Sequence, residues 1–285
     1  MKYILITGAS TGIGYDAARY LIERGGYHVF GSVRKQADAD RVQAALGTQF
    51  TPLLFDVTDE GAVKTAVSQI KEIVGDSGLF GLVNNAGIAV AGPLMHLPLD
   101  EMRQQLEVNV IGLLSVTQAC LPLLGAGKDS PYPPGRIVNI SSTNGRKAYP
   151  FLGPYSASKH ALEAITDALR GEMLIYGIQV IGINPGPIQT PIWDKADAID
   201  PTPFLGTDYE QALLYTKEYV VDRGRKGMPV EAVSKAICQA LESKRPKTRY
   251  PVVRSWLFDW AIPQWLPDRL VDWVVTRTLK IADGH

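Results

Sequence analysis

Short, uninterrupted apolar runs alternate along the chain with longer segments in which apolar residues recur every three or four positions. The runs have the length of strands and lack apolar–polar alternation, as expected where helices cover both faces of a parallel sheet. We predict strands at residues 3–7, 28–33, 51–56, 80–84, 136–141, 179–184 and 248–252. The helical pattern predicts helices at residues 13–24, 38–46, 60–74, 99–124, 155–176, 208–223 and 268–281.

This alternation predicts one α/β domain over residues 1–285, a Rossmann-type doubly wound parallel sheet of about seven strands in the order 3-2-1-4-5-6-7. Ligands of such sheets bind at the carboxyl ends of the strands. Residues 188–227, which follow the sixth strand, are therefore predicted to form a substrate lid, with a plain surface loop as the alternative. Residues 253–285 form a C-terminal extension.

Composition narrows the classes of protein and partner. Hydrophobic residues make up 46% of the 285 residues and charged residues 20%, which excludes a disordered chain. With 29 basic and 29 acidic residues the formal net charge is zero, so no overall positive charge favours nucleic acid as a partner. The two cysteines match no metal spacing, so we expect no metal and a reducing, cytoplasmic setting. No secretory signal and no membrane-spanning stretch is expected.

A glycine-rich turn, TGASTGIG at residues 7–14, joins the first strand to the first helix. Gly8 permits a tight turn, Gly12 allows close approach of a pyrophosphate, and Gly14 lets the helix pack near the strand. The free N–H groups of the helix would then face the phosphates, which predicts a dinucleotide site. The stretch also fits the hydrolase pattern G-x-S-x-G, but none of the four histidines follows an obvious strand end, which disfavours a hydrolase.

The end of the second strand indicates which dinucleotide is bound. An NAD site places an acidic residue there, whereas this chain has Val33 followed by Arg34 and Lys35. Arginine can hold a 2′-phosphate through paired, charge-assisted hydrogen bonds. The sequence therefore predicts NADP(H) over NAD(H), with a solvated basic turn as the alternative.

Further motifs follow in order: NNAG at 84–87, NVIG at 109–112, ISS at 140–142, YSASK at 155–159 and NPGPIQT at 184–190. With these motifs, residues 2–190 closely resemble the short-chain dehydrogenase/reductase family, and KTRYP at 247–251 is similar to members that act on steroids or retinoids. The resemblance implies a catalytic tetrad of Asn109, Ser142, Tyr155 and Lys159, in which Ser142 is chosen over Ser141 because it lies 13 residues before the tyrosine.

The glycine turn, the basic strand end and the resemblance together predict a set of cofactor-binding residues. They are Gly8, Ser10, Thr11, Gly12, Ile13, Gly14, Arg34, Lys35, Asp56, Val57, Asn85, Ala86, Gly87, Tyr155, Lys159, Pro185, Gly186, Ile188 and Thr190.

The chemistry of the tetrad also follows from the residues themselves. Tyr155 and Lys159 are four positions apart, so they share one helix face. A phenol has a pKa of about 10, too high for a base at neutral pH, and we expect the nearby ammonium and the positive oxidised nicotinamide to lower it. Ser142 can donate to a carbonyl oxygen on which charge develops. The resemblance alone implies that Asn109 holds a water linking Lys159 to solvent. A core tyrosine and a solvated lysine are the structural alternatives.

The residues expected around the tetrad are mostly apolar, which predicts a bulky, hydrophobic carbonyl substrate. They are Gly145, Ala148, Phe151 and Leu152 on one side and Ile188, Ile192, Trp193, Phe204 and Leu205 from the lid. The basic residues among them, Arg146, Lys147 and Lys195, are expected to face solvent. We predict NADP(H)-dependent reduction of a ketone or aldehyde, or the reverse oxidation. The alternatives are an NAD-dependent steroid, retinol or hydroxyacid dehydrogenase and, outside enzymes, a dinucleotide-binding sensor.

Two surfaces suggest further partners. The extension holds Trp256, Trp260, Trp265 and Trp273, for which core covering, a pocket rim, and contact with a membrane surface or a partner stay open. The predicted helices at 99–124 and 155–176 have apolar residues beyond those needed for one sheet face, including Leu113, Val116, Leu162 and Leu169. Members of the family often pair these helices across a two-fold axis, so we expect a homodimer or homotetramer.

Overall fold

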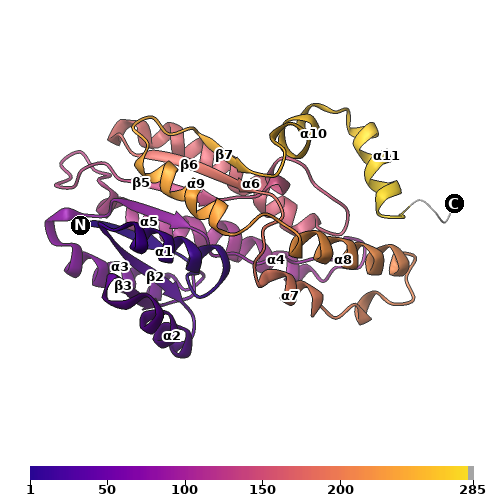
Figure 1. Ribbon diagram of the computed structural model, residues 1–285, viewed down its shortest axis with the longest axis horizontal. Coiled ribbons are helices and arrows are strands. Elements are labelled where there is room, and N and C mark those ends of the chain that lie inside the picture. Colours follow the sequence, from indigo (N-terminus) through magenta and orange to yellow (C-terminus); the bar gives the residue numbers. More distant parts are fainter. Residues whose placement is uncertain (282–285) are drawn as a thin grey trace.

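Seven parallel strands form one sheet in the order β3-β2-β1-β4-β5-β6-β7 in the computed structural model, as predicted (Figure 1). The structure describes residues 1–281, so residues 282–285 of the extension lie outside the described part. The strands are β1 (Lys2–Ile6), β2 (Tyr27–Val33), β3 (Phe50–Leu54), β4 (Gly81–Asn84), β5 (Arg136–Ile140), β6 (Gln179–Pro185) and β7 (Arg249–Val252).

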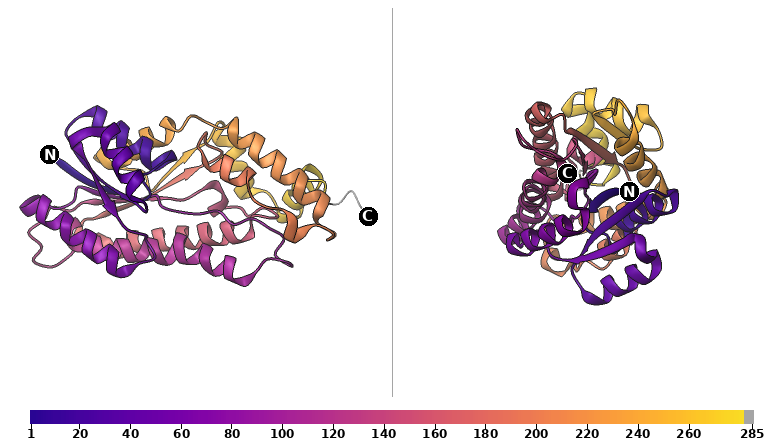
Figure 2. Two further views of the ribbon diagram at one scale, coloured as in Figure 1. Left: turned by 90° about the horizontal axis from the view of Figure 1, so that it is seen from below. Right: turned by 90° about the vertical axis from the view of Figure 1, so that its left-hand side faces the viewer.

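Helices cover both faces of this sheet, which explains why its strands are apolar throughout (Figure 2). On one face, α1 (Gly12–Arg24), α2 (Gln36–Leu46) and α9 (Glu231–Glu242) pack on strand residues such as Ile4. On the other, α3 (Glu60–Val74), α5 (Leu113–Cys120) and α6 (Gly153–Glu172) pack on residues such as Leu5. Neighbouring strand residues thus serve different cores.

Helix α9 is missing from the elements predicted above. Its buried Val233, Ile237 and Leu241 recur at every fourth position and pack in the core that α1 shares. Helix α9 follows the lid and packs on the sheet, so the segment between residue 227 and β7 belongs to the same domain.

The predicted helix at residues 99–124 is helical throughout but not regular. α4 (Leu99–Leu106) leads into a π-helical segment, Glu107–Gly112, before α5 and a final 3₁₀ turn, Leu121–Leu124. A π-helical turn inserts an extra residue and shifts the faces of the helix on either side, and such turns are frequent at functional sites.

The apolar residues that suggested helix pairing lie inside the chain's own core. Leu113, Val116, Leu162 and Leu169 are all at most 7% exposed. The expectation that they form a surplus apolar face is therefore wrong: two helices packed side by side on one sheet bury more than one stripe each. The exposed apolar residues at the end of this helical run are Leu174 and Ile175.

Length and composition would also allow one helix to cross a membrane. Leu99–Leu124 spans 26 residues, and its most apolar stretch has a mean hydropathy of 1.5. Core helices pass the same test, and this one buries Gln105, Asn109 and Val116 within the protein. Its apolar character therefore matches its place against the sheet.

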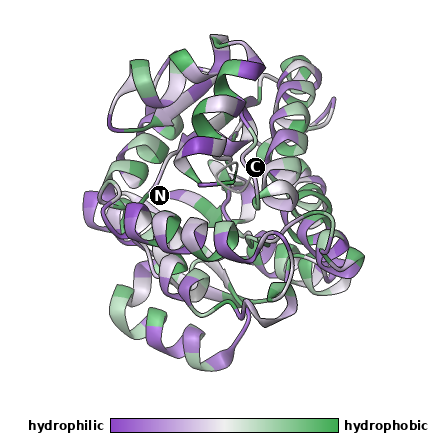
Figure 3. Ribbon diagram, turned by 90° about the vertical axis from the view of Figure 1, so that its right-hand side faces the viewer, coloured by the Kyte–Doolittle hydropathy of each residue, from purple (hydrophilic) through white to green (hydrophobic). Residues whose placement is uncertain are grey.

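The lid and the extension lie beyond the carboxyl ends of the strands (Figure 1). The lid contains α7 (Ile192–Asp197) and α8 (Glu210–Arg225). The extension contains a π-helical segment, Trp256–Ala261, followed by α10 (Ile262–Trp265) and α11 (Asp268–Thr278). Both hydrophobic and hydrophilic residues occur along the ribbons at this end of the molecule (Figure 3). Trp256, Trp265 and Trp273 are 62%, 87% and 53% exposed, so core covering is excluded for these three.

Candidate active site

The glycine turn between β1 and α1 has the geometry that a pyrophosphate requires. Gly8 and Gly12 have φ angles of +69° and +59°, which favour glycine. A Cβ on Gly14 would lie 2.3 Å from the Gly8 carbonyl oxygen, so only glycine fits there. Thr11 precedes α1 without a capping hydrogen bond from its side chain, which leaves N–H groups of the first turn available to an anion.

Hydrogen bonds to polar side chains hold this turn in place, among them Thr7 and Ser32, which are not in the predicted set of cofactor-binding residues. The Thr7 hydroxyl accepts hydrogen bonds from the backbone N–H groups of Asn85 and Ala86, both at 2.9 Å. The Asn85 amide donates to the carbonyl oxygens of Thr7 and Gly8 at 2.9 and 3.1 Å. Ser32 accepts from the Gly8 N–H at 2.9 Å. The NNAG segment is thus hydrogen-bonded to the glycine turn. A small hydroxyl residue at the end of a strand, as at Thr7 and Ser32, is the sequence signal that could have identified these contacts.

Three cations gather around the end of β2. Arg34 is exposed and lies 3.7 Å from the Asp56 carboxylate, while Lys35 immediately precedes α2. Arg41, which the sequence analysis missed, donates to the Ser10 carbonyl oxygen at 2.8 Å from within α2. Arg41 also pairs with Asp38 at 2.7 Å, so acids partly neutralise two of these cations, and Arg41 links α2 to the glycine turn.

The other predicted cofactor residues border the same region. The Thr190 side chain would lie 3.6 Å from a Cβ placed on Gly12, so the segment after β6 faces the glycine turn. Pro185 ends β6, and the Gly186 N–H donates to Val252 of β7 at 3.0 Å. Ile188 and Val57 are buried.

Tyr155, Lys159 and Ser142 converge beyond the end of β5. Lys159, 6% exposed, donates to the Ile140 carbonyl oxygen at 2.8 Å, and its Nζ lies 5.8 Å from the centre of the Tyr155 ring. Ser142 starts a short 3₁₀ turn, and its hydroxyl accepts from the Asn144 N–H at 3.1 Å. The solvated-lysine alternative is therefore excluded.

Asn109 sits within the π-helical segment and is 1% exposed. Its side-chain oxygen accepts from the Ile88 N–H at 2.9 Å, and its amide donates to the Ile88 carbonyl oxygen at 3.0 Å and to Ser158 at 3.1 Å. Asn109 thus joins the segment after NNAG to α6, on the helix that carries Tyr155 and Lys159.

Burial has the dominant effect on the proton-carrying groups. It raises the pKa of Tyr155, while hydrogen bonding with Ser142 acts in the lowering direction. In the chain itself desolvation therefore outweighs the groups that favour the phenolate, and the lowering expected from the ammonium and the oxidised nicotinamide together stays a prediction. Burial also lowers the pKa of Lys159 to about 8, against the raising effect of Glu163. The raised pKa keeps the Tyr155 hydroxyl protonated at neutral pH, and the pKa of the neighbouring Lys159 lies just above neutral.

The lid approaches the loop before α6 through aromatic contacts. Phe151, which is buried and has a φ of +64°, meets the ring of Tyr209 at 6.1 Å between centroids. Phe204 of the lid is also buried, and a Cβ on Gly92 would lie 2.8 Å from its ring. By contrast, Ile192 and Leu205 are 43% and 46% exposed. The lid thus packs on the loops beside the tetrad.

Two cations expected to face solvent are instead paired. Arg146 lies 3.3 Å from the buried Glu163 carboxylate, and Lys147 binds Asp268 of the extension at 2.6 Å. No positive charge of this loop is therefore left free for a substrate carboxylate.

Comparison with known proteins gives the family. The short chain dehydrogenase family matches residues 2–200. An NADPH-dependent 3-dehydrocapnine reductase of Ornithobacterium rhinotracheale is 45% identical over 280 residues, covering 98% of each chain. Retinol dehydrogenase 5 of Mus musculus is 33% identical, covering 97% of this chain and 88% of its own. The crystal structure of a Streptomyces avermitilis short-chain dehydrogenase superposes with a TM-score of 0.75 at 24% identity, over 99% of this chain and 97% of that one. The chain belongs to the short-chain dehydrogenase family.

Proposed function

We propose that this protein reduces a ketone or aldehyde to an alcohol with NADPH, with Tyr155 as the general acid. The observation that carries the proposal is the cluster of half-buried Tyr155 with buried Lys159 and Ser142, which lies at the same edge of the sheet as the glycine turn. Since Tyr155 and Lys159 share a helix and Ser142 follows β5, rigid elements fix all three.

The residues of the cluster divide the chemistry among themselves. Bound NADPH supplies the hydride that reduces the carbonyl carbon. Ser142 donates a hydrogen bond to the carbonyl oxygen and orients it, where negative charge then develops. Tyr155 gives its proton to that oxygen. The raised pKa of Tyr155 keeps the hydroxyl protonated, and so able to donate, at neutral pH. The Lys159 ammonium stabilises the resulting phenolate.

The glycine turn and the cations fit the phosphates of NADP(H). Gly8, Gly12 and Gly14 leave space where a Cβ would clash or strain the backbone, and the α1 N-terminus has free N–H groups. Arg34, with Lys35 and Arg41 beside it, supplies the positive charge that a 2′-phosphate needs. The bacterial relative that is named for NADPH dependence agrees with this assignment.

The substrate that fits best is a ketone with a large apolar part and no free carboxylate. Phe151 and Phe204 are apolar, and Arg146 and Lys147 are engaged in ion pairs. The similarity to retinol dehydrogenase 5 favours one specific alternative, oxidation of an apolar alcohol.

Steady-state assays test the proposal, with aliphatic, aryl and steroid ketones and short keto acids, and with NADPH and NADH. The expected result is reduction of apolar ketones with kcat/KM at least tenfold higher for NADPH than for NADH. Higher kcat/KM for keto acids contradicts the apolar substrate, and a preference for NAD with alcohols supports the alternative. Cofactor binding without turnover of any of these compounds supports the sensor.

A further inference from the structure

A buried ionic cluster lies one helical turn beyond the catalytic lysine. Along α6, Tyr155, Lys159 and Glu163 are spaced four residues apart, so their side chains follow one face of the helix. Glu163 is 5% exposed, slightly more buried than Lys159 at 6%. A buried carboxylate needs partners.

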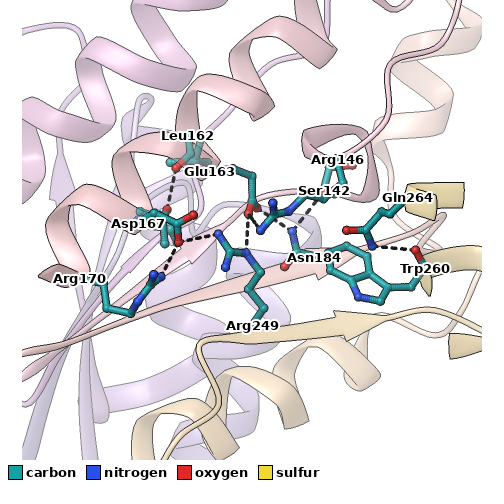
Figure 4. Close-up of polar contacts among 12 residues, drawn as sticks. Ser142, Arg146, Leu162, Glu163, Asp167, Arg170, Asn184, Arg249, Trp260 and Gln264 are labelled. Atoms are coloured by element: carbon teal, nitrogen blue, oxygen red, sulfur yellow. Dashed lines mark hydrogen bonds and ion pairs between the residues drawn. The ribbon is translucent and has the colours of Figure 1, made fainter. Parts of the chain in front are cut away.

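Each oxygen of the Glu163 carboxylate is held by a different element (Figure 4). One accepts from the Asn184 amide at 2.7 Å, at the end of β6. The other accepts from Arg249 Nε of β7 at 2.7 Å and lies 3.3 Å from Arg146 in the loop after β5. Arg249 also binds Asp167, one turn further along α6, and Asp167 in turn pairs with Arg170. The acid thus ties α6 to the ends of three neighbouring strands.

This arrangement reaches the catalytic residues in two ways. The Asn184 amide that binds Glu163 also donates to the Ser142 carbonyl oxygen at 3.3 Å, so the carboxylate holds the Ser142 loop. Lys159 has the Ile140 carbonyl as its neutral acceptor, and no carboxylate lies within ion-pair distance of its ammonium in residues 1–281. The negative charge of Glu163, acting from beyond ion-pair distance, favours the ammonium form of Lys159.

We propose that Glu163 is a positioning residue that keeps Lys159 charged and holds the Ser142 loop, and that Arg146 and Arg249 set how strongly its charge acts. It does not contact the reacting atoms. The inference rests on the proposed function, because it concerns the protonation of the lysine that supports Tyr155.

Opposite changes of charge around Lys159 separate this role from a merely structural one. Glu163→Gln removes the negative charge, so the pKa of Lys159 should fall by on the order of one unit. Glu163→Asp keeps the negative charge and should restore most of the Lys159 pKa.

Arg146→Gln removes a positive charge and should move the pKa of Lys159 upward. Arg146 Nε is buried without a hydrogen-bond partner, so this change leaves few groups unsatisfied. Asp167→Asn is the matched control, since it also removes a negative charge paired with Arg249 but lies one turn further from Lys159.

The measurement is a pH titration by NMR of protein labelled with ¹³C at the lysine ε-carbons, with the Lys159 signal assigned by its loss in Lys159→Arg. The alkaline limb of the kcat/KM profile should move in the same directions. Equal midpoints for the wild type and Glu163→Gln overturn the proposal. If Glu163→Gln does not fold, the Arg146→Gln titration decides, and an unchanged midpoint there overturns it. Because NMR needs no turnover, a chain that reduces no ketone refutes the proposed function and leaves this test intact.

Discussion

At the scale of single residues, the Tyr155 hydroxyl is the group whose removal is most informative. Tyr155→Phe deletes one oxygen from a half-buried ring and leaves the packing of α6 unchanged. We expect kcat to fall by about 10²–10⁴-fold, the usual contribution of a proton-transfer group, while NADPH affinity changes less than about threefold. Steady-state kinetics and fluorescence titration measure the two quantities.

Tyr149→Phe is the matched control for this change. Tyr149 lies in the loop before α6, and burial raises its pKa as well. Removal of its hydroxyl should leave kcat within about threefold of the wild type. If Tyr155→Phe also retains a near-normal rate, Tyr155 is not the general acid.

The second residue-scale prediction concerns Arg34. Arg34→Asp replaces the cation with an acid next to Asp56, and two carboxylates there would repel a 2′-phosphate. Loss of charge-assisted hydrogen bonds costs about 1.5–3 kcal/mol, so kcat/KM with NADPH should fall by about 10–100-fold, while NADH becomes the better cofactor. Arg103→Asp, which makes the same charge change on the exposed α4, should alter neither value. An unchanged NADPH preference in Arg34→Asp would place the 2′-phosphate elsewhere.

At the scale of elements, Glu242 at the end of α9 joins three parts of the α1 face. It accepts from the Tyr27 hydroxyl of β2 at 2.5 Å and from Arg24 of α1 at 2.8 Å, and it lies 3.5 Å from Lys2 of β1. Hydrogen bonding from Tyr27, followed by that from Arg24, holds the pKa of Glu242 at about 2. A carboxyl whose pKa is lower in the folded state stabilises the fold above its unfolded pKa, and this contribution is lost as the pH falls toward the folded value.

Glu242→Gln should therefore destabilise the protein in a pH-dependent way. We expect a loss of about 2 kcal/mol in the free energy of unfolding at pH 7, allowing for partial exposure of the carboxylate. By about pH 3 the difference from the wild type should shrink to less than half. Urea unfolding at both pH values measures it, with Glu231→Gln at the exposed start of α9 as control. A difference that is equal at both pH values would mean that the carboxylate charge does not stabilise the α1 face.

The elements also show what the sequence can and cannot predict. All seven strands and their order follow from buried apolar runs, because each run reports local burial on both faces. The π-helical segment at Asn109 does not follow, since one extra residue in a helix leaves apolar spacing almost unchanged. The hydrogen bonds of Ser32 and Arg41 join residues 24 and 31 positions apart, and nothing in the local pattern identifies such pairs.

The tetrad residues were predicted by motif, whereas their environment depends on the folded chain. Spacing placed Tyr155 and Lys159 on one helix face, and the structure confirms their proximity. The direction of the Tyr155 pKa shift depends on how completely the surrounding chain excludes water, which spacing does not encode. The same holds for Glu163, whose partners come from β6, β7 and the loop after β5.

At the scale of the whole molecule, we predict that two copies associate along α5 and α6, as a homodimer or as the dimer within a tetramer. Since Leu113, Val116, Leu162 and Leu169 are buried within one chain, the contact must use residues further along the outer surface of these helices. Ile175 and Leu174, directly after α6, are 79% and 65% exposed. Two copies that meet there would remove both from water.

Ile175→Glu tests this contact. Burial of an isoleucine contributes about 1.5–3 kcal/mol, so a charge in its place should weaken association at least tenfold. Light scattering at micromolar concentration should give at least twice the chain mass of 31.1 kDa for the wild type and a shift toward that mass for the variant. Leu257→Glu makes the same kind of change on the exposed extension and should leave the mass unchanged. A monomeric wild type refutes the association. If Leu257→Glu alone dissociates the protein, the contact lies on the tryptophan-rich extension instead, because that surface is then the one that the second copy covers.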